Sequence, residues 1–479
     1  MRSHHKFLDE DLRYQRVDTC GECQTCGPRG GHLCDVAKGG LRDYGGVRFT
    51  ADGFDCALPV TIDGHSACSF GCLYCFSKTI RGHVQGTEKE GATIGQCNIG
   101  FLERIFAGEG GQRGERVRKV LKYHAKVNGY PCPIQVGGLN DPMDNIERQQ
   151  GWFLKFCNLV GKYRQPARIS TKGNLLLVPE YQKAILEAGS HLFWFAFSLI
   201  SPDEERLAAI DVGAPSAAAR LECMKIANKL GCRTSLRFRP MLPGLSDYTP
   251  RHPYAYKELL QRSADAGAYA VSCEVAFLPG VWSECNQERW DRINGICGHD
   301  LKKVYGSFGQ WFTCTRPAYQ WTEAIMHAVR DEGHKVGLVV GVSDPVWKQL
   351  GDTGCCCGIR PDDPIWGNWQ RESATNRLLE AKNGIRSEIR FEDICPGWAH
   401  DVPLVDMVYV GAGPAVACKR SKMVWADKLQ KDWNQVSSQR GPIQYFQGAL
   451  VPSGRDREKN LIFKYVGLQR QHIRSVWRT

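Results

Sequence analysis

The feature that most constrains the fold is a regular alternation of short β-type runs with helical stretches between residues 57 and 278. Six runs of strand length recur there, and longer segments separate them; the runs are 57–62, 133–136, 167–171, 191–199, 233–239 and 268–276. Strands joined by helical crossovers pair in parallel. We therefore expect an α/β fold, a partial (β/α)6 barrel whose strand tips share the end where such barrels hold their chemistry.

Composition narrows the class of protein. The chain has 479 residues, of which 42% are hydrophobic and 24% are charged, as in globular rather than disordered proteins. The longest apolar run, 192–200, is far shorter than the roughly 18 residues that a membrane span needs. The first residues lack the apolar stretch of a signal peptide. We therefore expect a cytoplasmic protein with no membrane partner.

The patterns divide the chain into four parts. They are a Cys-rich segment (1–50), the barrel (51–280), an α/β extension (281–400) and a basic region (401–479). An insertion at about 80–130 carries a predicted helix at 115–127. Beyond the barrel, we expect strands at 334–342 and 405–410, a helix at 369–382, and a β-hairpin formed by 443–451 and 460–466 across a turn at 452–455.

Cysteine usage is unusual for a chain without an export signal. There are 22 cysteines, and in reducing cytosol clustered cysteines indicate metal ligands or catalytic thiols before disulfides. Cys68, Cys72 and Cys75 have the spacing C-x3-C-x2-C in a loop that follows the first strand. Three thiolates in one loop can bind three irons of a cubane iron–sulfur cluster and leave the fourth iron open to a small molecule. Three structural thiols or part of a zinc site are the alternative.

This loop resembles that of the radical S-adenosylmethionine (SAM) superfamily, and Tyr74 before the last cysteine fits the same pattern. The resemblance implies a radical-SAM barrel, a 4Fe–4S cluster on Cys68, Cys72 and Cys75, and SAM on the open iron. It also implies a 5′-deoxyadenosyl radical that abstracts hydrogen from the substrate. A reduced flavodoxin or ferredoxin is the expected electron donor.

A closer resemblance, over residues 57–250, is to the spore photoproduct lyase branch, whose members act on thymine-derived bases in DNA. Gly137 and Gly138 form the glycine-rich turn after the second strand, which the resemblance places at the methionine amino group. It also implies that Lys172 and Ser198, at the tips of the third and fourth strands, contact the cofactor, as Tyr74 does.

Two arginines on the fifth strand are further site candidates. Arg237 and Arg239 share one face because strand side chains alternate with a period of two. If that face points inward, the pair can hold a phosphate or carboxylate of the substrate, and we assign both to the catalytic site. If it points outward, they are merely solvated.

The chain contains more cysteines than one cluster requires. Cys20, Cys23, Cys26 and Cys34 supply four ligands within 15 residues, which suits a second iron–sulfur cluster or a zinc ion. Cys355, Cys356 and Cys357 are adjacent, so on an extended chain they point to alternate faces and cannot easily bind one metal. An auxiliary ligand, a hydrogen-donating thiol and simple packing remain open for them.

Positive charge is concentrated at the end of the chain. The net charge is +11, and residues 416–479 hold 13 Lys plus Arg against 4 Asp plus Glu, an excess of nine. Aromatic residues are interleaved with these cations, and the combination suits contact with nucleic-acid phosphates and bases. A solvated basic surface is the alternative.

These observations together predict a radical SAM enzyme of the isomerase or lyase type that modifies a nucleic-acid base, most plainly a thymine derivative in DNA. Rearrangement of a hypermodified thymine, as phage-encoded radical isomerases perform, fits better than photoproduct repair. The repair lyases need no N-terminal four-cysteine segment, and their hydrogen-donating cysteine has no counterpart at 139–144. A repair lyase and an enzyme that modifies a peptide or protein remain the alternatives.

Overall fold

The computed structural model describes most of the chain from residue 41 onward. The described residues are 41–44, 46–50, 53–54, 56–75, 77, 94–109, 111–125, 129–276, 278–279, 287–301, 310–311, 314–315, 319–404, 423–438 and 440–469. The four N-terminal cysteines, the predicted strand at 405–410 and the last ten residues lie outside them. No helix in the described part is long and apolar enough to cross a membrane.

An eight-stranded sheet forms the centre of the molecule, and its strand order is β13-β9-β8-β7-β6-β5-β3-β2. The strands in chain order are β2 (Val47–Phe49), β3 (Val60–Ile62), β5 (Ile134–Val136), β6 (Ala167–Thr171), β7 (Phe193–Ser198), β8 (Arg233–Met241), β9 (Ala270–Val275) and β13 (Val339–Val342). All neighbours pair in parallel except β2, which runs antiparallel to β3. The six predicted strands are thus confirmed as one mostly parallel sheet, which remains open like a partial barrel.

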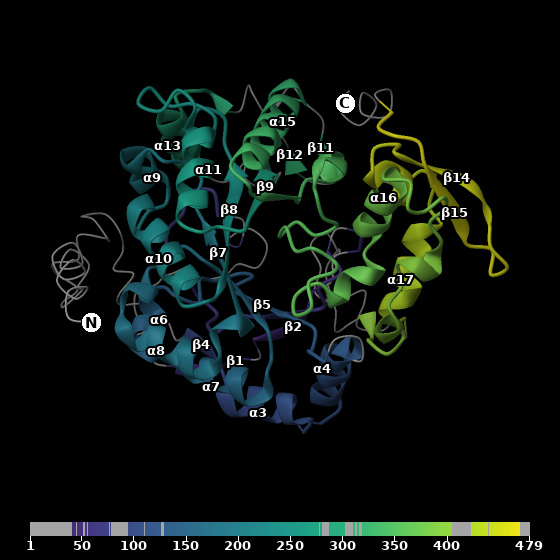
Figure 1. Cartoon of the computed structure of the whole chain (residues 1–479), viewed down its shortest axis with the longest axis horizontal. Coiled ribbons are helices and arrows are strands. Elements are labelled where there is room, and N and C mark those ends of the chain that lie inside the picture. Colours follow the sequence, from purple (N-terminus) through teal and green to yellow (C-terminus); the bar gives the residue numbers. More distant parts are fainter. Residues whose placement is uncertain are drawn as a thin grey trace.

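Helices follow the strands along the chain, and most of them lie on the outer side of the sheet (Figure 1). They are α3 (Ile99–Ala107), α4 (Gly111–Tyr123), α6 (Asn145–Gln150), α7 (Trp152–Tyr163), α8 (Pro179–Ala188), α9 (Glu204–Ile210), α10 (Ala217–Lys229), α11 (Ala255–Asp265), α13 (Gln287–Cys297) and α15 (Tyr319–Lys335). Their starts follow local chemistry: Asp144, Asp203 and Ser216 cap α6, α9 and α10 by accepting hydrogen bonds from free backbone N–H groups.

Aromatic side chains make up much of the core between these helices and the sheet. Phe193, Phe195 and Phe197 point to one face of β7, and their consecutive rings stack at centroid separations of 6.2 and 5.9 Å. Trp152 stacks on Phe156 at 5.1 Å within α7. All five are at most 1% exposed, and burial of each such ring stabilises the fold by about 2–3 kcal/mol.

The remainder of the chain packs beside the barrel. It contains the short helices η5 (Pro345–Leu350), η6 (Asn368–Glu372), η7 (Phe391–Asp393), η8 (Gly397–His400) and α18 (Pro442–Tyr445), the helices α16 (Ala374–Lys382) and α17 (Trp425–Trp433), and the hairpin β14 (Leu450–Arg455) and β15 (Leu461–Tyr465). Two 3₁₀ turns, η3 (Leu175–Leu177) and η4 (Ser190–Leu192), lie in the barrel, and the small strands β1 (Leu41–Tyr44), β4 (Ile94–Cys97), β10 (Leu278–Pro279), β11 (Gln310–Trp311) and β12 (Cys314–Thr315) form two minor sheets.

Several predicted boundaries beyond residue 330 were wrong. The strand predicted at 334–342 starts only at Val339, because α15 continues through Lys335. The helix predicted at 369–382 is two pieces, since Ser373 leaves the helix to cap α16. The hairpin exists, but residues 442–445 are helical and the turn follows Arg455 instead of spanning 452–455. The division into four parts stays a prediction, although β13 of the third part extends the barrel sheet.

Candidate functional site

A cavity of about 320 Å³ opens among the carboxyl ends of the parallel strands. Each described residue assigned to the site from sequence lines it: Cys68, Cys72, Tyr74, Cys75, Gly137, Gly138, Lys172, Ser198, Arg237 and Arg239. These residues come from strand ends and loops that span up to 171 positions of the chain. Parallel strands place their carboxyl ends along one edge, which is why residues so far apart in sequence meet.

The cysteine loop is fixed by backbone hydrogen bonds to the loop after α9. The Gly71 N–H donates to the Val212 carbonyl at 2.7 Å, and the Leu73 N–H donates to the Ile210 carbonyl at 2.9 Å. From the other side, the Ser69 N–H donates to the Asp144 carboxylate at 2.6 Å. Asp144 also caps α6, so this helix and the loop after α9 hold the loop between them.

A buried ionic network lies against the second cysteine of the loop. Lys172 Nζ contacts Cys72 Sγ at 3.0 Å, the Tyr74 hydroxyl at 2.6 Å and Asp211 Oδ1 at 2.9 Å. The other oxygen of Asp211 accepts from Arg220 Nη1 at 2.7 Å, and Tyr74 also donates to Asp211. A lysine ammonium has three donors, so these contacts use the full capacity of Lys172.

The charges of this network support one another. Burial opposes ionisation of Asp211, but Lys172 and Arg220 outweigh that effect and hold the pKa of its carboxyl well below its usual range. Burial also opposes the charge on Lys172, yet Asp211 and the Cys72 sulfur raise the pKa of the ammonium. The ion pairs are almost fully desolvated, and removing one partner of such a pair costs about 3–5 kcal/mol.

The three loop thiols suit the iron ligands of a cubane cluster. Cys68, Cys72 and Cys75 line one cavity, and Lys172 supplies an N–H donor to the Cys72 sulfur. Burial raises the pKa of Cys68 and raises that of Cys72 to about 12, so these thiols ionise readily only when a metal binds them. Among the described residues, no three His, Cys, Asp or Glu side chains gather closely enough to hold a single metal ion. A cubane cluster does not need three ligands around a single metal ion, because each thiolate binds a different iron.

The glycine-rich turn after β5 borders the cavity next to this loop. Gly137 has a φ of +80°, and a Cβ there would meet Pro142 and the Ser170 carbonyl at 2.6 and 2.7 Å, so only glycine fits. The N–H groups of Gly138 and Leu139 both donate to Asp63 Oδ1, at 2.8 and 3.0 Å. These two N–H groups are therefore already occupied by a protein partner.

Arg237 and Arg239 both line the cavity, so their shared face points inward. Arg237 Nη1 donates to Ser198 Oγ at 3.3 Å, and Arg239 Nη1 lies 3.5 Å from Glu274 Oε2. Burial and the neighbouring guanidiniums of Arg239 and Arg168 together lower the pKa of Arg237 to about 9. This crowding of cations at the cavity end suits an anionic ligand.

Several residues of the site were missed by sequence reasoning. Asp63 immediately follows β3, and that position at a strand tip was a usable signal. Asp211 and Arg220 had none, because one lies in an irregular loop and the other within a helix that only packing turns inward. The proposed ligands Cys20, Cys23, Cys26 and Cys34 lie outside the described residues.

A buried carboxyl on α6 should make stability depend on pH. Glu147 is 0% exposed, and burial raises its pKa from 4.5 to about 8. Its Oε1 lies 3.1 Å from the Tyr181 hydroxyl. Because the folded-state pKa is raised, the folded protein keeps this proton between about pH 4.5 and 8 while the unfolded chain loses it. We therefore expect the free energy of unfolding to fall as pH rises through this window.

Urea unfolding of the wild type and of Glu147→Gln over this pH range measures the effect. The glutamine variant cannot ionise. Over this pH range, the decrease in its free energy of unfolding should therefore be smaller than that of the wild type by at least about 2 kcal/mol. Glu180→Gln, an exposed position at the start of α8, is the matched control and should keep the wild-type slope. Equal slopes for the wild type and Glu147→Gln would show that Glu147 is not protonated in the folded state.

Comparison with known proteins agrees with this geometry. Residues 64–251 match the family model described as the Radical SAM superfamily, and that segment includes the cysteine loop, the glycine turn and β5 to β8. The chain is 25% identical over 242 residues to uncharacterized proteins of Mycobacterium tuberculosis and Mycobacterium bovis. The match spans 48% of this chain and 63% of those relatives, which is less than two thirds of their length.

Solved structures that match part of this chain include two kinds of protein. A spore photoproduct lyase mutant with bound AdoMet and dinucleoside spore photoproduct is 15% identical, with a TM-score of 0.42 over 62% of this chain and 79% of that one. SuiB of Streptococcus suis bound to the precursor peptide SuiA is 14% identical, with a TM-score of 0.31 over 51% and 45%.

Proposed function

We propose that this protein, an enzyme of the radical SAM type by its domain at residues 64–251, abstracts hydrogen from a thymine-derived base in DNA and rearranges a group on it. The observation that carries the proposal is that the three loop thiols and two inward arginines line one cavity. A 4Fe–4S cluster and SAM, when bound, supply a carbon-centred radical there. The chain's own residues orient both reactants and exclude water.

The side chains around the cluster loop would hold the cofactor. Cys68, Cys72 and Cys75 would each bind one iron. The open side of the Gly137–Gly138 turn and the Ser198 hydroxyl would receive the methionine and ribose parts of SAM. Lys172 and Tyr74 already bond to Asp211, so we expect them to position the Cys72 sulfur and to reach SAM only by exchanging a partner.

DNA is favoured as the substrate by the charge of the C-terminal region. Arg455, Arg457 and Lys459 are exposed around the end of the β14–β15 hairpin, which projects from the body of the molecule at the edge of the view (Figure 1). Cations on a projecting hairpin can reach phosphates on either side of a bound base, and each neutralised phosphate releases counterions. This hairpin belongs to the basic segment 416–479, of which residues 423–438 and 440–469 are described.

Charge reversal on the hairpin tests this part of the proposal. We expect Arg455→Glu/Arg457→Glu/Lys459→Glu to weaken DNA binding and to lower the slope of log affinity against log salt by about three, since each phosphate contact contributes about 0.9. Reversal of three exposed lysines on the outer helices α8 and α10, at Lys183, Lys225 and Lys229, is the matched control. If both triple variants bind DNA like the wild type, the hairpin is not the contact.

The function itself is tested with the anaerobically reconstituted protein, SAM and dithionite. 5′-Deoxyadenosine is measured with and without DNA from the source organism or its virus. The DNA is then digested, and the masses of its nucleosides are measured by mass spectrometry. DNA-dependent cleavage with an isomeric or mass-shifted nucleoside supports the proposal. Release of two thymidines from a photoproduct substrate would identify a repair lyase instead. Cleavage stimulated by a peptide and not by DNA would contradict it.

The proposal also includes an electron donor and a second metal site. An electron donor such as flavodoxin or ferredoxin would reduce the cluster, and dithionite replaces it in the assay. A second iron–sulfur cluster or a zinc ion on Cys20, Cys23, Cys26 and Cys34 would account for the N-terminal spacing. Metal analysis of Cys23→Ala against the wild type would measure that second site.

A further inference from the structure

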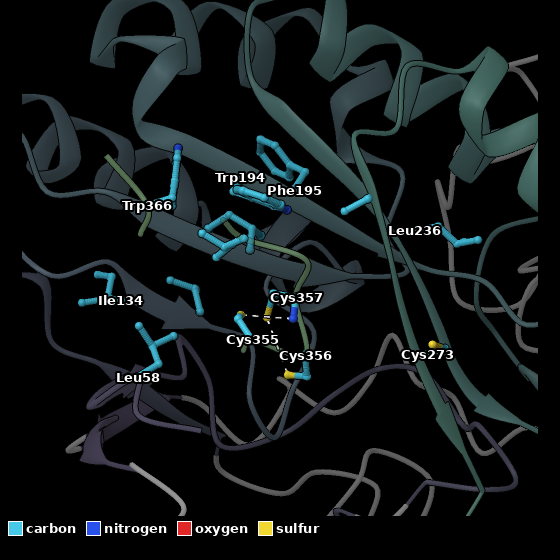
Figure 2. Packing of buried hydrophobic residues seen from close by; sticks show 14 of the residues in the cluster. Leu58, Ile134, Trp194, Phe195, Leu236, Cys273, Cys355, Cys356, Cys357 and Trp366 are labelled. Atoms are coloured by element: carbon cyan, nitrogen blue, oxygen red, sulfur yellow. Dashed lines mark hydrogen bonds between the residues drawn. The ribbon is translucent and has the colours of Figure 1, made fainter. Parts of the chain in front are cut away.

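The extension that follows the barrel meets the cavity at few points. Of its described residues, Ser343 alone lines the cavity. The cysteine triplet Cys355, Cys356 and Cys357 lies instead among the buried hydrophobic residues of the core (Figure 2). The Cys357 N–H donates to Cys355 Sγ at 3.2 Å, within the triplet itself. The contact of the extension with the cysteine loop comes from another element, the helix α13.

Helix α13 reaches the cysteine loop through Arg289. Its Nη2 donates to the backbone carbonyl of Cys72 at 3.0 Å. The same carbonyl accepts from the N–H of Cys75 at 3.2 Å, and this bond closes the turn between the second and third cysteines. A carbonyl has two lone pairs, so it can accept both donors at once. Arg289 thus bonds to the atom that closes the turn between two proposed iron ligands.

The barrel fixes the position of α13. Trp290, Ile293 and Cys297 of this helix are at most 4% exposed. A Cβ on Gly244, in the loop after β8, would meet the Cys297 carbonyl at 2.1 Å, so this loop and the end of α13 are in close contact. The Gly244 carbonyl in turn accepts from Arg206 Nη1 of α9 at 3.0 Å. Since the loop after α9 holds the cysteine loop, Arg289 completes a closed circuit of contacts around it.

Two cations contact different atoms of Cys72. Lys172 Nζ, at the tip of β6, lies 3.0 Å from its sulfur, and Arg289 Nη2 lies 3.0 Å from its carbonyl. Lys172 is also bonded to Asp211, at 2.9 Å, whereas Arg289 brings its charge from a separate element. A reduced 4Fe–4S cluster carries one more negative charge than the oxidised cluster. A nearby cation therefore favours the reduced form and raises the reduction potential.

We propose that Arg289 is a positioning residue of the cluster site: it fixes the turn between Cys72 and Cys75, and its charge raises the reduction potential of the cluster. α13 lies beyond residues 64–251, the segment that matches the superfamily, so this contact comes from outside the matched domain. The role rests on the cluster ligands of the proposed function and is independent of the substrate.

The effect of the charge is tested by redox titration of the reconstituted enzyme, followed by electron paramagnetic resonance. Arg289→Gln removes the cation, so its midpoint potential should lie below that of the wild type, whereas Arg289→Lys should restore most of the wild-type value. Arg292→Gln, which removes a cation from an exposed position of the same helix, is the matched control and should leave the potential unchanged. Equal potentials in the wild type and Arg289→Gln, or equal shifts in both glutamine variants, overturn the role of the charge.

The positioning role is tested by the retention of iron. Residues that hold a metal ligand in place typically contribute tenfold or more to metal affinity, so a chelator should remove iron from Arg289→Gln about tenfold faster than from the wild type. Arg289→Lys should lose iron at an intermediate rate, since an ammonium is a point donor in place of a planar guanidinium. Circular dichroism of each variant checks that the fold is kept. Iron loss from Arg289→Gln at the wild-type rate, with an unaltered resonance spectrum, overturns the positioning role.

Failure of the cluster site and failure of this role give different results. A wild-type protein that takes up no iron overturns the proposed cluster ligands, and the role of Arg289 falls with them. A wild type that binds iron and cleaves SAM, with an Arg289→Gln variant that matches it in potential and iron retention, overturns the role of Arg289 alone. A lower potential and faster iron loss in that variant support the role, whether or not DNA stimulates cleavage.

Discussion

Replacing Cys72 by alanine should abolish cleavage of SAM. The side chain lines the cavity between the other two loop cysteines, and it is the one whose sulfur accepts from Lys172 at 3.0 Å. Without it, one iron has no protein ligand and Lys172 loses a partner. We expect 5′-deoxyadenosine production to fall below detection and the iron content of the reconstituted protein to drop.

The matched control is a buried cysteine outside the loop. Cys232 precedes β8, is 4% exposed, and does not line the cavity. Cys232→Ala should therefore retain cleavage and iron, with only the small loss of stability that follows from removing one buried sulfur. If Cys72→Ala still cleaves SAM, or if Cys232→Ala loses cleavage equally, the loop is not the cluster site.

Replacing Asp211 by asparagine should have the largest effect on stability. The carboxyl is 0% exposed and is shared by Lys172 and Arg220, so the change leaves two buried cations without their counter-charge. We expect the free energy of unfolding to fall by about 3–5 kcal/mol, as for other broken buried ion pairs. The cysteine loop should also loosen, because Tyr74 and the neighbouring Val212 carbonyl hold it to this segment.

Chemical denaturation measures the first effect, and the electron paramagnetic resonance spectrum of the reduced cluster measures the second. Asp265→Asn, an exposed position at the end of α11, serves as control and should change stability by no more than about 0.5 kcal/mol. A stability loss below about 1 kcal/mol, with an unaltered spectrum, would contradict the account of the network.

The barrel was predictable because its strands carry strong local signals. The six runs are of strand length and alternate with longer, mostly helical segments, so strand order and direction followed from the crossover rule. The cavity lining followed for the same reason: Lys172, Ser198 and Arg237 stand at strand tips or ends that parallel pairing brings to one edge. Local pattern and site position coincide in this part of the chain.

The other features of the site and of the fold depend on packing that no local sequence pattern encodes. Asp211 and Arg220 meet only because α9 and α10 fold back on the sheet, and a buried ion pair has no sequence period. Beyond residue 330, helix and strand signals overlap, so α15 and α18 took residues that the apolar pattern had assigned to strands.

In the proposed function, one cavity brings a radical source and a DNA base together. The most direct measurement uses DNA whose thymine-derived bases carry deuterium on the 5-methyl carbon or its substituent, with the reconstituted enzyme, SAM and dithionite. We expect mass spectrometry to find deuterium in the 5′-deoxyadenosine formed. DNA-independent formation of 5′-deoxyadenosine that contains no deuterium would contradict it.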